Sequence, residues 1–414
     1  MSADGAFPYA RLSDLAEVTG GVTLGRTIPD AASVELPYLR VANVQDGYID
    51  TSDLKTVRVL QSEVQRYAVL KGDVLLTEGG DFDKLGRGAV WDGRVSPCLH
   101  QNHLFRVRCN PAKLLPEYLS IYLASDGGRR YFLSIAKQTT NLATINSSQL
   151  KQMPIPCPGL DEQRRIVEVL EALGEQERAI EAAVVKLRTV RRSMLVESIG
   201  QVKVDPRTGS SGSFTVRDAG EVRMGKQLSP SSREFGKQFP YLRVANVLDG
   251  WIDYADVKTM GFSESEREIY RLLPGDILLN EGQSLDLVGR SAIFRGYSED
   301  VYFQNTLVRF RPGDGLSPDY AQAVFSYWLM TGVFAGIAKQ TTSIAHLGGE
   351  RFAGLPFPMA APDEQERIAR MLRAWDERIA GEESALEKLR VLKAGLVDDL
   401  LAGRARRVGA MGEL

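Results

Sequence analysis

The chain reads PYLRVANVQDGYID from Pro37 to Asp50 and PYLRVANVLDGWID from Pro240 to Asp253. Twelve of the fourteen positions are identical, and the two segments lie 203 residues apart. This period far exceeds the roughly 20–50 residues per repeat that build solenoids and propellers. We therefore predict that a whole folding unit is duplicated and that the two copies have similar roles.

Other segments recur in the same order, which extends the duplication over nearly the whole chain. The matched pairs are KGDVLLTEGG (71–80) with PGDILLNEGQ (274–283), LGRGAVWDG (85–93) with VGRSAIFRG (288–296), AKQTTNLATI (136–145) with AKQTTSIAHL (338–347), and PIPCPGLDEQRRI (154–166) with PFPMAAPDEQERI (356–368). Between the copies, KVDPRTGSSGSF (203–214) has the Pro, Gly and Ser content of a flexible linker.

The composition limits the class of protein. The chain has 414 residues, enough for two domains, and its 43% hydrophobic and 25% charged content is ordinary for a folded protein. No apolar run reaches the length of a membrane span, and the N-terminus lacks the regions of a signal peptide, so a cytoplasmic location is expected. The cysteines have neither CxxC spacing nor counterparts in the other copy, so we expect free thiols at Cys98, Cys109 and Cys157. The net charge of −2 and the pI of about 6.1 argue against a uniformly basic surface but allow a local basic face.

Each copy divides into a mixed part and a helical part. Runs such as YLRVANV, GDVLLT, RGAVW and HLFRVRC predict strands. Ser62 and Ser263 are expected to cap short helices, and a longer helix is predicted over 116–136. The resulting fold class is α+β, with two similar mixed α/β domains separated by a long antiparallel two-helix coiled coil. The predicted segments are a first domain at 1–158, a helix at 159–200, a linker at 201–213, a second domain at 214–360, a helix at 361–403 and a basic tail at 404–414.

The two helical segments carry heptad patterns. Asp161, followed by Glu162, can cap the first helix, and Asp363 begins the second. Residues at alternating spacings of four and three indicate a coiled coil. The first seam contains Ile166, Leu170, Leu173, Glu177, Ile180, Val184, Leu187, Arg191 and Met194. The second seam contains Ile368, Leu372, Trp375, Ile379, Glu382, Leu386, Leu389, Lys393, Leu396 and Leu400. We expect the seams to pack antiparallel, which would relate the domains by an approximate two-fold axis at opposite ends of a rod, and the four charged seam residues to pair across them.

These features together resemble the specificity subunits of Type I restriction–modification systems. The resemblance rests on GDVLLTEGG…LGR, on QTT followed by PIP and DEQRRI before a coiled-coil helix, and on the repetition of this order. It implies that each domain is a target recognition domain reading one half of a split DNA sequence. It also implies that the helices fix the spacing of the halves and dock two DNA methyltransferase subunits, with restriction subunits added outside. Adenine methylation would use S-adenosylmethionine held by the methyltransferase partner, so no cofactor is expected on this chain.

The geometry of a duplicated reader agrees with this resemblance. Two similar domains on one face of double-stranded DNA favour half-sites about one helical turn apart, near 34 Å. The domains differ between their shared segments, so the target is expected to be asymmetric and bipartite.

Enzyme signatures are weak throughout the sequence. Two glycine-rich stretches only approach the P-loop motif: GGVTLGRT (20–27) has Arg26 where Lys is required, and GEVRMGKQ (220–227) has Gln227 where Ser or Thr is required, so we expect simple turns. His100 and His103 are replaced in the second copy by Phe303 and Thr306, so we expect partly buried histidines instead of a metal site. An adenine-methyltransferase motif of the Asn/Asp-Pro-Pro-aromatic type is lacking. We therefore expect a non-catalytic chain, with a stand-alone DNA-acting enzyme such as a nuclease and a coiled-coil scaffold as alternatives.

Candidate DNA contacts are polar or basic residues in predicted loops. Shared residues suit phosphate contacts, whereas base readout is expected where the copies differ, at Lys84 and Gln283. Arg40 and Arg243 either face phosphate or pair with a carboxylate such as Asp46 or Asp249. The other candidates either contact DNA or maintain the fold; they are Arg87, Lys137, Gln138, Thr139, Thr140, Arg290, Lys339, Gln340, Thr341 and Thr342. The tail GRARRVG (403–409) either binds phosphate or an acidic partner, or is simply solvated.

Overall fold

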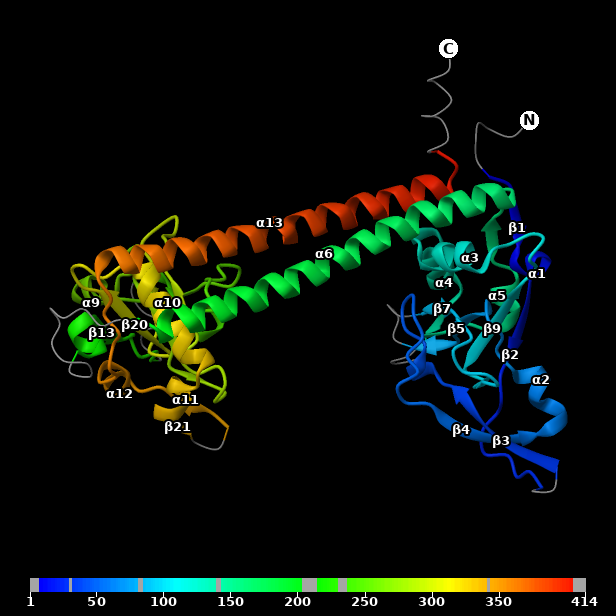
Figure 1. Cartoon of the computed structure of the whole chain (residues 1–414), viewed down its shortest axis with the longest axis horizontal. Helices are drawn as coiled ribbons and strands as arrows, with labels where there is room; N and C mark the ends of the chain where they lie inside the picture. Colours follow the sequence, from blue (N-terminus) through cyan, green and yellow to red (C-terminus); the bar gives the residue numbers. More distant parts are fainter. Residues whose placement is uncertain are drawn as a thin grey trace, which may run out of the picture. The chain divides into compact units, whose positions relative to one another are not determined.

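The computed structural model describes residues 7–29, 32–80, 85–138, 143–202, 214–229, 237–340 and 343–404 (Figure 1). It divides into unit 1, which contains Met1–Glu181 and Glu383–Leu414, and unit 2, which contains Ala182–Glu382. Residues 203–213 of the predicted linker and residues 405–414 of the predicted tail lie outside the described residues.

Unit 1 is built on two main sheets. The first is antiparallel, in the order β2 (Ala16–Gly20), β9 (Leu104–Cys109), β5 (Val74–Thr77), β7 (Gly88–Val90). The second has the order β4 (Lys55–Leu60), β3 (Ser33–Leu39), β8 (Leu99–His100), and its β3–β8 pair is parallel. A short pair joins β1 (Tyr9–Arg11) to β12 (Pro154–Pro156). The helices of the domain are α1 (Leu12–Leu15), α2 (Val64–Tyr67), α3 (Pro116–Ala124), α4 (Asp126–Ile135) and α5 (Ser147–Lys151).

Unit 2 repeats both main sheets, but the β1–β12 pair is reduced there to an isolated bridge between Thr215 and Pro356. Its first sheet has the order β13 (Gly220–Met224), β20 (Leu307–Pro312), β16 (Ile277–Asn280), β18 (Ser291–Ile293). Its second sheet has the order β15 (Lys258–Gly261), β14 (Gln238–Leu242), β19 (Tyr302–Phe303), and β14 and β19 are again parallel. The helices are α7 (Val216–Ala219), α9 (Glu264–Tyr270), α10 (Pro318–Met330), α11 (Val333–Ile337) and α12 (Gly349–Ala353). The predicted duplication and the α+β class are confirmed.

Some local predictions were wrong. The helix predicted over 116–136 is interrupted at Ser125, whose Oγ accepts a hydrogen bond from Gly128 N (3.3 Å) and so starts a separate helix, α4. Ser62 lies inside a 3₁₀ turn and is not its N-cap residue. The side chain of Glu63 accepts the hydrogen bond from Leu60 N at the start of this turn (3.2 Å). Ser263 does cap α9, in a reciprocal box with Glu266. The segment YLRVANV leaves the strand after Leu39 and forms a 3₁₀ turn.

A buried glutamine fastens the start of each long helix to its domain. In unit 1, Gln163 accepts a hydrogen bond from Leu115 N (2.9 Å) and donates to Lys113 O and Pro158 O (2.9 Å each). Gln365 does the same in unit 2, with Ser317 N (2.8 Å), Gly315 O (3.1 Å) and Ala360 O (2.9 Å). Its whole amide is satisfied by the backbone, so truncation would leave buried polar groups unpaired. This role explains why both copies contain DEQ.

The long helices are α6 (Leu160–Gly200) and α13 (Pro362–Leu401). Asp161 lies inside the first helical turn and is therefore not the N-cap, and α13 begins at Pro362, one residue before the predicted Asp363. The apolar seam residues are buried or half-buried, namely Ile166, Leu170, Leu173, Ile180, Val184, Leu187 and Met194 on α6 and Ile368, Leu372, Trp375, Ile379, Leu386, Leu389, Leu396 and Leu400 on α13.

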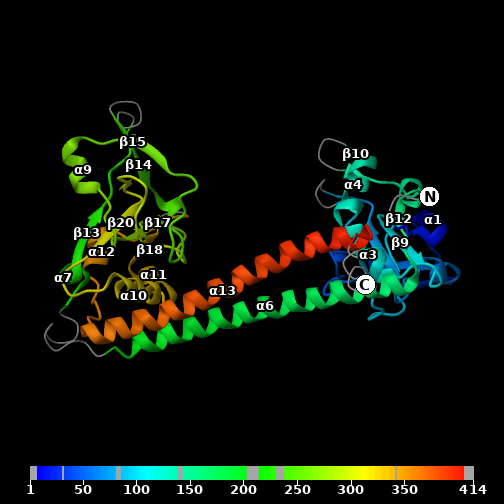
Figure 2. The same cartoon turned by 90° about the horizontal axis from the view of Figure 1, so that it is seen from above.

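Within each unit, the portions of α6 and α13 that belong to it run antiparallel, as Figure 2 also shows. In unit 1, Leu170 packs in the same core as Leu401, and Lys393 Nζ donates to Glu177 Oε2 (2.6 Å). In unit 2, Ile199 and Ile368 share a core, and Arg191 binds Asp376 (Nη2–Oδ2 2.9 Å). Pairing across the seam is thus confirmed for Glu177 and Lys393, whereas the partner of Arg191 lies off the predicted seam.

Candidate nucleic-acid interface

A small three-stranded ribbon in each unit joins the glycine-rich segment to the KQTT segment. In unit 1 its order is β6 (Gly79–Gly80), β11 (Ala143–Thr144), β10 (Lys137–Gln138). In unit 2 its order is β17 (Gly282–Gln283), β22 (Ala345–His346), β21 (Lys339–Gln340). The central strand pairs with both neighbours, so Ala345 lies opposite both Gln283 and Gln340. Residues about sixty positions apart therefore meet on one ribbon.

The two ribbons contain five of the fourteen predicted DNA contacts, on the strands β10, β17 and β21. Lys137, Lys339 and Gln340 are exposed, and Gln283 is half-buried. Exposed Lys and Gln side chains suit contacts with DNA phosphate. Five further candidates lie outside the described residues, as does the side chain of Gln138. These five are Lys84, Thr139, Thr140, Thr341 and Thr342.

Glycine in the first ribbon serves strand packing. A Cβ atom on Gly79 would lie 3.1 Å from Ala143 O and 3.0 Å from Thr144 Cγ2. The close approach at Gly79 is therefore made by a neighbouring strand of the protein.

Arg87 and Arg290 follow the glycine-rich loops. Among the described residues, the Nε atom of each is buried without a hydrogen-bond partner. Arg87 lines a cavity of about 290 Å³ together with Arg129 and Asp46, whose side chains pair at 3.1 Å. In unit 2, Gln322 donates a hydrogen bond to the Oγ of Ser291, the residue after Arg290 (3.0 Å). The surroundings of this arginine therefore differ between the units.

Arg40 and Arg243 directly follow β3 and β14 and pair with carboxylates. Arg40 Nη2 donates to Asp53 Oδ2 (2.9 Å), and Arg243 Nη2 donates to Asp256 Oδ2 (2.6 Å). The hydrogen bond from Arg40 lowers the pKa of Asp53 below its usual value. The carboxylate partners are thus Asp53 and Asp256 instead of the suggested Asp46 and Asp249, and DNA contact by these arginines stays a prediction.

Sequence reasoning missed a glutamate–histidine pair beside each ribbon. Glu78 Oε2 lies 3.0 Å from Nδ1 of His103, and Glu281 Oε2 lies 3.0 Å from Nδ1 of His346. Both copies of the glycine-rich segment keep this glutamate, but the histidines come from different segments, so no repeated pattern marked them. His103 was expected to be partly buried, but its side chain is 58% exposed.

His100, by contrast, is fully buried in unit 1. Its Nδ1 lies 2.9 Å from Tyr67 O, and burial lowers the pKa of the imidazole from 6.5 to about 4. The imidazole of His100 is therefore uncharged at neutral pH.

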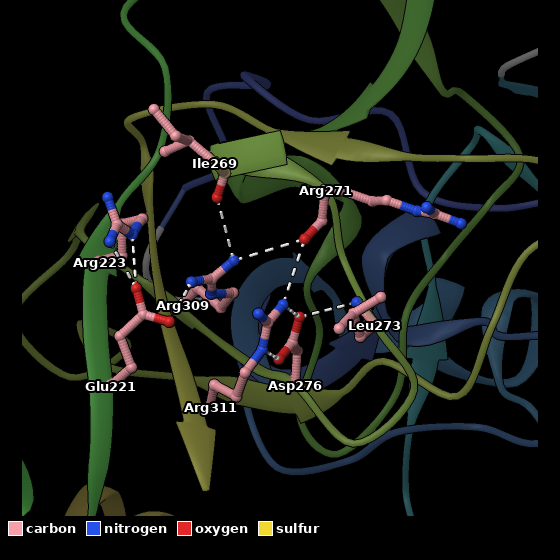
Figure 3. Close-up of polar contacts among 8 residues, drawn as sticks. All are labelled: Glu221, Arg223, Ile269, Arg271, Leu273, Asp276, Arg309 and Arg311. Carbon is pink, nitrogen blue, oxygen red and sulfur yellow. Dashed lines mark hydrogen bonds and ion pairs between the residues drawn. The ribbon is translucent and has the colours of Figure 1, made fainter. Parts of the chain in front are cut away.

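Arginine–carboxylate ion pairs, each with one buried partner, lie at the first sheet of each unit, and Figure 3 shows those of unit 2. Arg311 donates to both carboxylate oxygens of Asp276 (2.6 and 2.8 Å), and Asp276 also accepts a hydrogen bond from Leu273 N (2.8 Å). Arg309, only 1% exposed, donates to Glu221 (2.7 Å) and to the backbone oxygens of Ile269 and Arg271. Unit 1 repeats the bidentate pair with Arg108 and Asp73 (2.8 and 2.7 Å). The aspartate of GDVLL and GDILL is therefore structural, and these arginines are already engaged within the protein.

Two searches for other site types found no candidates in the described part of the chain. No three His, Cys, Asp or Glu side chains of the described residues are grouped so that they could hold a metal ion. None of the described helices is both long and apolar enough to span a membrane.

The duplicated fold has counterparts among known proteins. Residues 7–185 match the model of the Type I restriction modification DNA specificity domain. The type I restriction enzyme MjaX specificity subunit of Methanocaldococcus jannaschii is 23% identical over 95% of this chain and 92% of its own length. The EcoKI specificity subunit of Escherichia coli is 26% identical over 45% of this chain and 40% of its own length.

Solved structures show the same fold. A chain from a structural study of complex assembly and conformational transition in the type I R-M system has a TM-score of 0.65 at 17% identity, covering 98% of this chain and 100% of its own. The HsdS subunit from Thermoanaerobacter tengcongensis has a TM-score of 0.56 at 18% identity, covering 96% and 97%.

The repeated domain, the paired long helices and these matches define a DNA sequence-specificity subunit. Residues 7–185 form a Type I restriction modification DNA specificity domain, and nearly the whole chain is similar to Type I specificity subunits, which confirms the resemblance noted in the sequence.

Proposed function

We propose that each unit is a target recognition domain that reads one half of an asymmetric, bipartite DNA target. The observation that carries the proposal is the ribbon, which places a shared basic segment beside a strand whose following sequence differs between the units. Lys137 and Lys339 hold the same ribbon position in the two units, whereas the sequences that follow β6 and β17 are DFDK at 81–84 and SLDL at 284–287. Shared basic residues suit the common phosphate backbone, and segments that differ in sequence suit two different half-sites.

We further propose that α6 and α13 set the spacing of the half-sites and dock two methyltransferase subunits. Each helix contributes residues to both units. Three apolar side chains on these helices remain largely exposed: Val185 (64%), Val391 (65%) and Leu392 (62%). Exposed apolar residues on a helix that already has a packed seam are available to another protein.

In the proposed complex this chain supplies sequence specificity and no catalytic group. The methyltransferase subunits would hold S-adenosylmethionine and modify adenine, restriction subunits would join outside them, and the complex would act in the cytoplasm.

A domain exchange tests the proposal. Residues 1–158 are replaced by the first recognition domain of another Type I specificity subunit, and the complex with methyltransferase is tested for binding to DNA fragments. The expected result is that one half-site changes and the other is retained. A chimaera in which both halves change, or neither does, contradicts the modular assignment. As a matched control, exchange of 214–360 should change the opposite half-site.

A further inference from the structure

Each unit displays one exposed aromatic ring on the turn near the end of the repeated segment. Tyr48 is 61% exposed in unit 1, and Trp251 is 55% exposed at the equivalent position in unit 2. The residue that follows each ring is buried, since Ile49 is 5% and Ile252 is 8% exposed. The chain therefore anchors this turn in the core and still leaves both rings in solvent.

The turn that holds each ring is rigid. Gln45 N donates to Tyr48 O (2.9 Å), and Leu248 N donates to Trp251 O (2.9 Å). Gly47 and Gly250, with φ of +79° and +80°, occupy the left-handed region just before the rings. Their amides donate to Gly88 O (3.1 Å) and Ser291 O (3.0 Å) in the first sheet of each unit. A preorganised turn presents an aromatic side chain at a low entropic cost of binding.

The fold itself gains little from these rings. Tyr and Trp stabilise a protein mainly by burying a large apolar surface, and half or more of each ring's residue area remains in water. Tyr and Trp are also the residues most enriched among those that dominate protein–protein binding energy. An exposed ring at the same position in both copies therefore indicates a contact with another molecule.

The charges beside the rings favour a protein over DNA. Asp46 and Asp50 flank Tyr48 two positions away on either side, and Asp249 and Asp253 flank Trp251 in the same way. Carboxylates at these positions oppose the DNA phosphates. Arg129 offsets the charge of Asp46 in unit 1, so the field is more negative in unit 2. A surface with an apolar pocket and a basic rim would complement both turns.

The duplication identifies which protein would bind. The two domains are proposed to read different half-sites, but this turn is nearly the same in both. We propose that each turn docks one methyltransferase subunit, with Tyr48 or Trp251 entering an apolar pocket that has a basic rim. This inference rests on the proposed function, because it requires two copies of the same partner on one chain.

The test measures binding of the methyltransferase subunit to the full chain by calorimetry, with its stoichiometry checked by analytical ultracentrifugation. The unmodified chain should bind two subunits. Tyr48→Ala and Trp251→Ala should each weaken one of the two binding events at least tenfold, and the double variant should weaken both. Each ring is exposed, so thermal unfolding of the variants should match that of the unmodified chain.

Matched controls separate the ring from other effects. Tyr48→Trp and Trp251→Tyr exchange the residues that the two copies already use, and both should bind normally. Tyr9→Ala removes a ring that is 64% exposed outside the repeated segment and should also change nothing.

Three outcomes would overturn the inference. Two tight binding events in both alanine variants would show that the rings do not dock the subunit. Unchanged subunit binding with weaker DNA binding by the assembled complex would assign the rings to DNA. Absence of binding by the unmodified chain would contradict the proposed function itself, and the docking site with it.

Discussion

Gly86 packs directly on the ring of Phe132, so closely that a Cβ atom on this glycine would lie 2.4 Å from Cε2 of the ring. The second copy repeats the contact, with a Cβ on Gly289 falling 2.3 Å from Cδ2 of Phe334. Both glycines also occupy the left-handed region, with φ of +70° and +81°. The glycine of LGR and VGR is therefore required by backbone conformation and by packing. It lets the backbone at this position pack against the ring of Phe132 on α4 or of Phe334 on α11.

Gly86→Ala should destabilise unit 1 by roughly 2–5 kcal/mol. Left-handed backbone costs a non-glycine residue about 1–2 kcal/mol, and overpacking adds about 1–3 kcal/mol. Urea unfolding measures the loss. Gly25→Ala is the matched control, because Gly25 also has a positive φ (+79°) but nothing within 4 Å of its Cβ position. Equal losses in the two variants would contradict the packing argument.

His100→Phe should reduce the acid sensitivity of unit 1. The pKa of His100 is about 4 in the folded chain against an ordinary 6.5, so the unfolded chain binds the extra proton between these values. The contribution of the neutral His100 ring to the free energy of unfolding is fully present above pH 6.5. It is lost as the pH falls towards 4, because the unfolded chain then binds a proton that the folded chain does not. The loss at pH 5 should be roughly 2 kcal/mol.

The substitution His100→Phe copies the second domain, where Phe303 occupies the same place and is fully buried. Unfolding free energies at pH 7.5 and pH 5 should differ less in the variant than in the unmodified chain. Identical pH dependence in the two proteins would show that His100 does not titrate as described.

Reversing the seam ion pair in unit 1 should reveal its contribution. Glu177→Lys and Lys393→Glu should each cost about 1–3 kcal/mol, because each places like charges at a half-buried contact, and the double reversal should restore most of the loss. The pair of Glu181 and Arg390 is the control, since both side chains are about half exposed and should contribute about 0–1 kcal/mol. Additive losses in the seam double variant would argue against direct pairing.

Lys339→Ala should weaken DNA binding by the assembled complex equally for all sequences. Loss of one phosphate contact should lower the slope of log affinity against log salt by about 1. Lys258→Ala, which removes an exposed lysine paired with Asp256 in the other sheet, should leave the slope unchanged. A loss confined to one half-site sequence would instead assign Lys339 to base readout.

Patterns that repeat along the chain were predictable from the sequence. The duplication is visible because matching segments recur in order, and the seams are visible because heptads are local. Ile166 and Ile368, both fully buried, lie where the heptads placed them.

Features that depend on tertiary contacts were not predictable. The ribbon strands are only two residues long, too short for any periodicity, and they pair with segments distant in sequence. Gln163 looked like an ordinary helical residue, because its backbone partners lie in loops that only the fold brings together. Asp376 binds Arg191 from outside the seam, since long side chains reach beyond the heptad positions.

Mapping of methylated adenine tests the central claim most directly. Long-read sequencing is applied to the native host, to a strain in which only this gene is deleted, and to the deletion strain carrying the gene again. The account predicts that a single split, asymmetric adenine motif disappears on deletion and returns with the gene. If the methyltransferase is expressed and the methylated motifs are the same in all three strains, the chain does not determine the DNA target and the account is wrong.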